Sequence, residues 1–405
     1  MMFRVKKHVL FFALCFIMAA SAAAFAFLPV REAFVQIVFK QGSVLEARAR
    51  DVLNTCEGAK YRPACYDQEI PNRTVDLSLA DSFAVTKIVQ RQDQNYWYCH
   101  VLGHKLSARE TAKDPSKWED VVAQCPSGMC SNGCIHGAFQ ERYRTEALAP
   151  PEAYALVPEL REVCEERANW HPTGLEQATC YHALGHLAMY ITGAEIHTAV
   201  DICRQVAVKS DGRDFTQVCF DGAFMQIFQP LEPEDIALVE GKNPGREGLY
   251  NFCKNFNGNA RAACWGEGWP LFGEEIKTPQ GLMKFCSTFS GAVEQNRCFS
   301  GMFYVLMAQF NLDEKKIVPF CGGISDARRG ECFSQAASRL IETDYGLIEK
   351  AVGICNAAEQ AGVGEECYQS LIGFSKFDFK RESAEALKFC EKLPDKWALI
   401  CKSVR

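Results

Sequence analysis

The spacing of apolar residues in the C-terminal half of the chain predicts helices. The stretch Cys298–Phe310 (CFSGMFYVLMAQF) has no proline and a broad apolar face, which is typical of a helix buried on several sides. Asn311-Leu312-Asp313 then supplies a turn and an N-cap for a shorter helix, expected over Glu314–Phe320. A polar loop is expected up to Cys332, where the next long helix would start. The pattern predicts alternating long and short helices.

Cysteines recur with the same period as these helix pairs. In the C-terminal half they form couples 11 or 12 residues apart, and the second cysteine of each couple recurs every 34 or 35 residues. A fixed period in this range is the signature of a two-helix repeat. The spacing predicts disulfides that join the end of a short helix to the start of the next long one. The expected pairs are Cys56–Cys65, Cys99–Cys130, Cys125–Cys134, Cys164–Cys180, Cys203–Cys219, Cys253–Cys264, Cys286–Cys298, Cys321–Cys332, Cys355–Cys367 and Cys390–Cys401.

The predicted fold class is all-α, an αα-repeat solenoid of about nine to ten repeats of roughly 34–46 residues, cross-linked by disulfides. A two-helix unit cannot bury its apolar face alone, so it has to stack on its neighbours. Closing a loop of ~15 residues with a disulfide contributes about 3 kcal/mol in the chain-entropy model. The predicted segments are 1–31 (signal-anchor or signal peptide), 32–55 (juxtamembrane helix or linker), 56–229 (histidine-containing repeats), 230–248 (inserted loop) and 249–405 (regular repeats).

The N-terminal segment predicts export. Arg4, Lys6 and Lys7 precede an uncharged run over 9–30, which is long enough for a helix that crosses a bilayer. Small residues within the run also fit a cleaved signal peptide, so a retained membrane anchor and a removed signal are both open. The flanking positive charges place the N-terminus in the cytoplasm and the remainder outside it, in the periplasm or the extracellular space.

Composition agrees with this compartment. The chain has 405 residues, 21 of them cysteine, and a net charge of −6. We find no basic block that could neutralise phosphates, so nucleic acid is excluded as the main partner. Because the sequence contains no CxxC pair, the cysteines favour disulfides over a metal cluster and therefore an oxidising environment. The expected partners are the membrane and an envelope protein or peptide.

The repeat length and the cysteine placement over Cys56–Cys401 resemble those of the Sel1-like and Helicobacter cysteine-rich repeat families. These families are secreted solenoids of disulfide-linked helix pairs, so the resemblance implies the same architecture here. The alanine- and tyrosine-rich helix signatures of those repeats are absent, and the spacing within each couple is longer. The resemblance is therefore architectural, and it implies neither an activity nor a site residue.

Histidines supply the candidate chemistry. The pattern H-x-x-G-H occurs at His100–His104 and again at His182–His186, and His136 holds the matching repeat position between them. Two histidines four residues apart project from one helix face and can share a metal ion. The glycine inside each pattern costs helix propensity, which indicates that a neighbouring backbone or a ligand approaches closely there.

Equivalent positions on successive long helices predict a stripe that continues to Asp221, which follows Cys219 at the offset at which His136 follows Cys134. The sequence favours one metal centre, made either of His100, His104 and His136 or of His182, His186 and His136. A dinuclear centre with all five histidines is a third arrangement if the superhelix is tight. Nitrogen-rich ligation with a carboxylate favours zinc, copper or iron. Asp67 holds the equivalent offset after Cys65.

Two functional classes follow from these observations. The first is a metal-dependent enzyme or metal carrier with a histidine-rich pocket. The second is a non-catalytic scaffold that binds a protein or peptide on its concave face, with the histidines as hydrogen-bonding residues between helices. Catalytic residues are not identifiable, since the sequence lacks the GxSxG, P-loop and HExxH motifs. At helical spacing, Trp265 and Tyr304 are expected in the core, and Glu267 is expected to be solvated.

Overall fold

The computed structural model describes residues 42, 44–143, 147–231, 233–289 and 291–404, and the extended secondary structure in this part of the chain is helical. The only β pairing among the described residues consists of isolated bridges, Arg167 with Trp170 and Val208 with Asp214. None of the described helices has the length and apolarity needed to cross a lipid bilayer. The expected N-terminal anchor or signal segment, 1–31, lies outside the described residues.

The helices follow one another closely from residue 44 onward. After a first helix over 44–56, the N-terminal half contains α2 (Arg62–Arg73), α3 (Leu79–Gln92), α4 (His100–Thr111), η1 (Pro115–Lys117), α5 (Trp118–Ala123), η2 (Cys130–Asn132), α6 (Gly133–Arg142), α7 (Pro150–Ala155), α8 (Val157–Leu160), α9 (Gly174–Ile191), α10 (Ile196–Ala207), α11 (Thr216–Phe228), α12 (Pro233–Leu238), α13 (Gly245–Cys253) and α14 (Gly258–Glu267). The C-terminal half contains η3 (Trp269–Phe272), α15 (Gly273–Ile276), α16 (Pro279–Ser287), α17 (Ala292–Gln309), α18 (Glu314–Gly322), α19 (Asp326–Thr343), η4 (Tyr345–Leu347), α20 (Ile348–Gln360), α21 (Gly364–Asp378), α22 (Ala384–Lys392) and α23 (Asp395–Ser403).

The predicted alternation of long and short helices is present in α17, α18 and α19. Between α17 and α18, Asn311 and Leu312 both adopt positive φ, and the Asp313 side chain caps α18 by accepting a hydrogen bond from the Lys315 amide. The start of α19 differs from the prediction, because the helix begins at Asp326 and not at Cys332. The polar stretch before Cys332 is the half-exposed first part of an amphipathic helix. Its polar sequence resembles that of a loop, so the prediction placed the start of the helix too late.

All ten predicted disulfide pairs are present, including the long-range Cys99–Cys130. The second cysteine of each pair lies in an α-helix, except in Cys99–Cys130, where Cys99 precedes α4 and Cys130 begins the short η2. Cys15, the one cysteine outside these ten pairs, lies outside the described residues. The ten bonds indicate an oxidising, extracytoplasmic environment.

The two halves of the chain have separate apolar cores. One cluster of buried residues runs from Ala49 to Cys264, and a second runs from Ile276 to Cys401. The division therefore lies after α14, beyond the expected inserted loop 230–248. That segment is also not a plain loop: it contains α12, which starts at a proline, and the start of α13.

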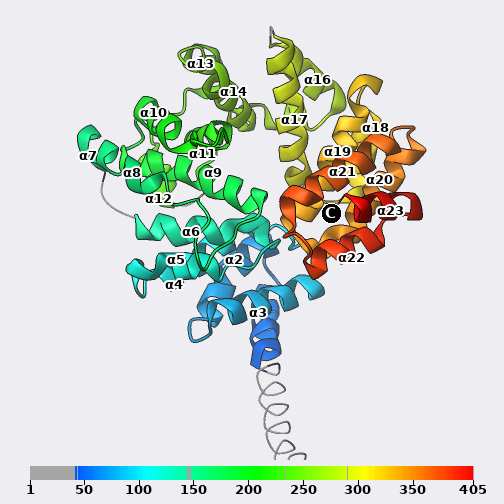
Figure 1. Ribbon diagram of the computed structural model, residues 1–405, viewed down its shortest axis with the longest axis horizontal. Helices are drawn as coiled ribbons and strands as arrows, with labels where there is room; N and C mark the ends of the chain where they lie inside the picture. The colour runs from blue at the N-terminus through cyan, green and yellow to red at the C-terminus, as the bar shows by residue number, and fades with distance from the viewer. Residues whose placement is uncertain (1–41, 43, 144–146, 232, 290, 405) are drawn as a thin grey trace, which may run out of the picture.

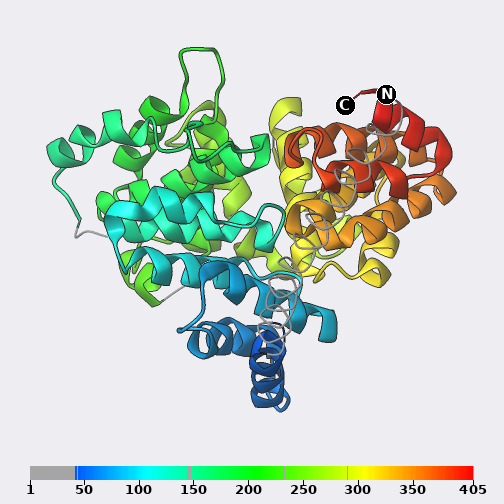
Figure 2. The same ribbon diagram turned by 60° about the horizontal axis from the view of Figure 1, so that its bottom comes forward.

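The long helices curve round until the C-terminal half meets the N-terminal half. They pack side by side in the order α4, α6, α9, α11, α14, α17, α19, α21, and α21 returns to contact α9 (Figures 1 and 2). At this closure the Tyr345 amide donates to the Gly128 carbonyl at 3.0 Å, and Lys87 lies 3.3 Å from the Asp344 carboxylate. In the same region α19 contacts η2, so the two halves of the chain lie against each other there.

Candidate metal centre

Close contact between the backbones of α4 and α6 determines where their histidines lie. A Cβ at Gly133 would fall 2.2 Å from the His100 carbonyl oxygen, and one at Gly137 would fall 2.1 Å from the His104 carbonyl oxygen. A Cβ at Gly103 would lie 2.8 Å from the Cys134 amide nitrogen. Only glycine fits at these positions, so the two helices touch and their imidazoles reach one another.

The same arrangement recurs between α9 and α11. A Cβ at Gly185 would lie 2.0 Å from the Cys219 carbonyl oxygen, and one at Gly222 would lie 1.9 Å from the His182 carbonyl oxygen. The glycines inside the two H-x-x-G-H patterns therefore serve the approach of a neighbouring backbone, which was one of the two predicted reasons for them.

His100, His104 and His136 bring three imidazole nitrogens together. His104 Nε2 lies 3.1 Å from His100 Nε2 and 3.1 Å from His136 Nδ1, and all three nitrogens lie within 4.8 Å of one another. His136 is 1% exposed, and the other two histidines are half-buried. Among the described residues, these histidines form the group that can hold a metal ion, which is the first of the predicted arrangements.

The outer ring nitrogens of this group fix which nitrogens face inward. His100 Nδ1 donates to the Cys130 carbonyl at 3.3 Å, and His136 Nε2 donates to the Thr179 carbonyl at 3.1 Å. A neutral imidazole with one nitrogen donating presents a lone pair on the other. Both inward nitrogens are therefore acceptors, and an imidazole held by a backbone carbonyl in this way is the usual outer shell of a metal ligand.

His182 and His186 on α9 form a second pair beside the first group. Their Nε2 atoms are 3.2 Å apart, and His186 Nδ1 donates to the Gln226 side chain at 2.6 Å. His182 also forms a hydrogen bond with the backbone of Val218. The His136 and His182 rings are stacked with centroids 5.6 Å apart. All five predicted histidines therefore lie in one cluster, although only three form a compact ligand set.

Burial keeps these imidazoles neutral. Burial, reinforced by the Arg339 guanidinium, lowers the pKa of His100 to about 4. Burial together with the neighbouring histidines holds the pKa values of His104, His136 and His182 well below the usual range. A metal ligand has to be deprotonated, so these residues are ready to bind an ion at neutral pH.

Asp221, the predicted carboxylate ligand, lies outside this group of three. Its Oδ1 accepts a hydrogen bond from Gln217 at 2.8 Å. Burial raises the pKa of Asp221 and that of Glu267, and the charge of Asp221 raises the latter further. Glu267 is half-buried and accepts a hydrogen bond from the Gln229 side chain. The expectation that Glu267 is solvated is therefore wrong, because α11 covers it. Asp67 accepts from the Tyr96 hydroxyl at 2.6 Å.

A strained turn supports the His100 side of the centre. Cys130, Ser131 and Asn132 all adopt positive φ, at 53°, 47° and 55°, although none is glycine. All three are buried, and the Cys99–Cys130 disulfide links the turn to the residue before His100. Backbone strain of this kind persists only where the surroundings enforce it, and it is concentrated at functional sites.

The opposite side of the curve contributes residues that the sequence did not single out. Arg339 of α19 is 4% exposed and lies with its Cζ 4.0 Å from the Tyr304 ring centroid and 5.6 Å from that of Tyr98. Tyr304 was expected in the core, but it is 37% exposed, and its ring covers this guanidinium. No local sequence signal marks Arg339, because its neighbours Tyr98 and Tyr304 are distant in sequence and are brought to it only by the fold.

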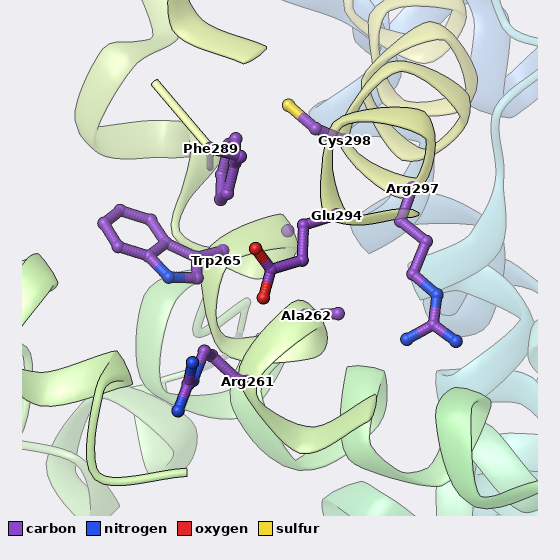
Figure 3. A pocket seen from close by; sticks show the side chains of 8 residues that line it. Arg261, Ala262, Trp265, Phe289, Glu294, Arg297 and Cys298 are labelled. Carbon is purple, nitrogen blue, oxygen red and sulfur yellow. The ribbon is translucent and has the colours of Figure 1, made fainter. Parts of the chain in front are cut away.

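The remaining histidines and the surface pocket lie elsewhere. His171 pairs with Glu166, and His197 stacks on Phe256, away from the histidine cluster. The pocket in Figure 3 lies between α14 and α17, with Trp265 and Phe289 as walls and Glu294 extending toward them. None of the histidines lines it.

Comparisons of the chain with models of protein families, with curated proteins and with solved structures found no match. The geometry of the histidine cluster is therefore the feature of this chain that points to a function.

Proposed function

We propose that this protein is an extracytoplasmic metal-binding protein that holds one transition-metal ion on His100, His104 and His136. The observation that carries the proposal is the convergence of three imidazole nitrogens within 4.8 Å of one another. For His100 and His136, the opposite ring nitrogen donates to a backbone carbonyl. The inward nitrogens of His100 and His136 both present lone pairs to His104 Nε2. Without an ion, the one proton that His104 Nε2 can carry would have to be shared between these two acceptors.

The donor set favours zinc, copper or iron, because imidazole nitrogen suits these ions and magnesium or calcium would need oxygen ligands. Three protein ligands leave a coordination position for water or a substrate, as in catalytic zinc sites. This favours a centre that uses its ion, as a metal-dependent enzyme does, over simple storage by a carrier. The reaction itself does not follow from the ligands.

Architecture and location complete the proposal. We interpret the succession of helix pairs as a disulfide-linked αα-repeat solenoid of the kind that the Sel1-like resemblance implies. The uncharged N-terminal run would anchor this solenoid in a membrane or direct its secretion. His182 and His186 would then either stabilise His136 by stacking or bind a second ion.

The test is metal stoichiometry. The full-length oxidised protein, stripped of metal and then loaded with Zn²⁺, is expected to retain about one ion per chain after desalting, as a three-histidine site requires. His104→Gln should weaken the affinity at least about a hundredfold, because second-shell changes alone cost about 10–100-fold. His197→Gln is the matched control, since this exposed histidine stacks on Phe256 away from the cluster.

Circular dichroism establishes that each variant is folded. Absence of stoichiometric metal from the wild-type protein would refute the proposal and favour the scaffold alternative. Two ions per chain, one of them lost in His182→Gln, would instead support the dinuclear arrangement.

A further inference from the structure

Arg339 carries a buried positive charge whose hydrogen-bonding capacity is only partly used. Its Nη1 donates to the Tyr304 hydroxyl and to the Glu342 carboxylate. Its Nε is buried without a partner, and among the described residues no hydrogen bond involves Nη2. A guanidinium with one unused edge offers two parallel N–H donors, which match the two oxygens of a carboxylate.

This guanidinium and the candidate metal centre both lie beside Tyr98. Tyr98 connects the two, since the Arg339 Cζ lies 5.6 Å from its ring centroid and the same ring is stacked on His100 at 6.2 Å. The charge of Arg339 also acts on His182 of α9. Arg339 therefore approaches the histidines of α4 and α9 from the other half of the chain.

The charges around the centre are unbalanced. The charged and titratable groups that act most strongly on His100, His104, His136 and His182 are other imidazoles, Arg339 and Lys105, while Asp235 is among the groups that act on His186. A divalent ion on three neutral imidazoles would keep its full charge, because the Glu342 carboxylate near Arg339 is already paired with that guanidinium. Uncompensated buried charge is costly, so an anion between the two would be strongly stabilised.

We propose that the site binds a small carboxylate ligand between the metal ion held by His100, His104 and His136 and the free edge of Arg339. This inference depends on the proposed metal centre and names the class of ligand that the centre takes. Tyr98 and Tyr304, whose rings lie over the guanidinium, are 36% and 37% exposed, so Arg339 lies beneath an accessible surface of two phenol rings. The ligand would enter beside them.

The experiment uses the full-length protein loaded with Co²⁺, whose visible absorption reports the ligands of the ion, and titrates it with acetate. Wild type is expected to show a saturable spectral change. Arg339→Lys keeps the charge but loses the two-donor edge, and should weaken acetate binding about tenfold or more. Arg328→Lys is the matched control, because Arg328 lies on the same helix and pairs with Glu331.

A second variant guards against a folding defect in Arg339→Lys. Glu342→Gln removes the carboxylate that competes for the guanidinium and should tighten acetate binding about threefold or more. An acetate response that is absent, or equal in Arg339→Lys and Arg328→Lys, would overturn the inference, as would a clear preference for inorganic phosphate. Bound Co²⁺ is quantified in every sample, so loss of the metal centre is distinguished from loss of anion binding.

Discussion

At the scale of single residues, the position of each site histidine depends on a neighbouring glycine. Gly137 follows His136 directly, and a Cβ there would overlap the His104 carbonyl. The missing side chain lets α4 and α6 touch, which brings His104 Nε2 and His136 Nδ1 to 3.1 Å. The ligand set is therefore specified by glycines as much as by histidines.

Substitution of Gly137 by alanine should separate the two helices. We expect Gly137→Ala to destabilise the fold by about 1–3 kcal/mol, the usual cost of overpacking, and to lower metal affinity. Gly301→Ala is the control, because Gly301 also lies in a helix but has open space at its Cβ position. It should stabilise the protein by about 0.5–1 kcal/mol through helix propensity. Thermal denaturation with metal titration checks both, and similar behaviour of the two variants would contradict the role of the backbone contact.

The spacing of the histidines within the repeats is local information, and it predicted a centre on His100, His104 and His136 as one of three arrangements. The sequence did not single out Arg339, which shares α19 with Arg328 and carries no distinguishing pattern of its own. It also placed Glu267 in solvent, because the residues that cover a carboxylate come from another helix. Residue roles that depend on contacts distant in sequence were not predictable in this way.

At the scale of elements, the period of the cysteines was the strongest signal. The spacing predicted nine of the ten disulfides directly and left Cys99 and Cys130 to form the tenth. The start of α19 was missed, because polarity alone does not separate a loop from an exposed helical turn. Cys99–Cys130 departs from the common pattern with a separation of 31 residues, and it links a left-handed turn to the start of α4. This bond therefore has a local role beside its contribution to stability.

Removal of this disulfide should affect the metal centre selectively. In the chain-entropy model, Cys99→Ala with Cys130→Ala and Cys390→Ala with Cys401→Ala each cost about 3–4 kcal/mol. Only the first pair of substitutions should also lower metal affinity, because it releases the turn whose carbonyl holds His100 Nδ1. Zinc titration at a temperature where both variants remain folded is the measurement. Equal affinities in the two variants would show that the turn does not support the site.

At the scale of the whole molecule, the closure of the helical curve buries a carboxylate. Asp378 of α21 is 1% exposed, and neither carboxylate oxygen has a hydrogen-bond partner. Burial, with the nearby charges of Glu342 and Glu176, raises the pKa of Asp378 well above its usual range. These acidic groups come from α21, α19 and α9, the three helices that meet at the closure. The curvature that brings them together could not be predicted, because it depends on small angles added over many helix pairs.

Protonation of Asp378 should therefore favour the closed arrangement. Because folding raises the pKa of Asp378, the protonated carboxyl makes its full contribution to stability below the ordinary carboxyl pKa of about 4. This contribution is lost as the pH rises through the pKa of Asp378 in the folded state. Asp378→Asn should stabilise the protein at pH 8 by on the order of 1–3 kcal/mol, the cost of an unsatisfied buried group, with a smaller gain at pH 5. Denaturant melts at both pH values measure this, with exposed Asp395→Asn as the control. A gain that does not grow with pH would contradict it.

The contact between α21 and α9 also restricts how such a chain can change in evolution. An array that is open at both ends can gain or lose a repeat without disturbing the others. Here, loss of the α17–α18 pair would shift α19 by one repeat. This shift would move Arg339 away from Tyr98, whose ring is stacked on His100. The number of helix pairs between α9 and α21 is therefore fixed by the site, and growth of the array is tolerated only outside that closed portion.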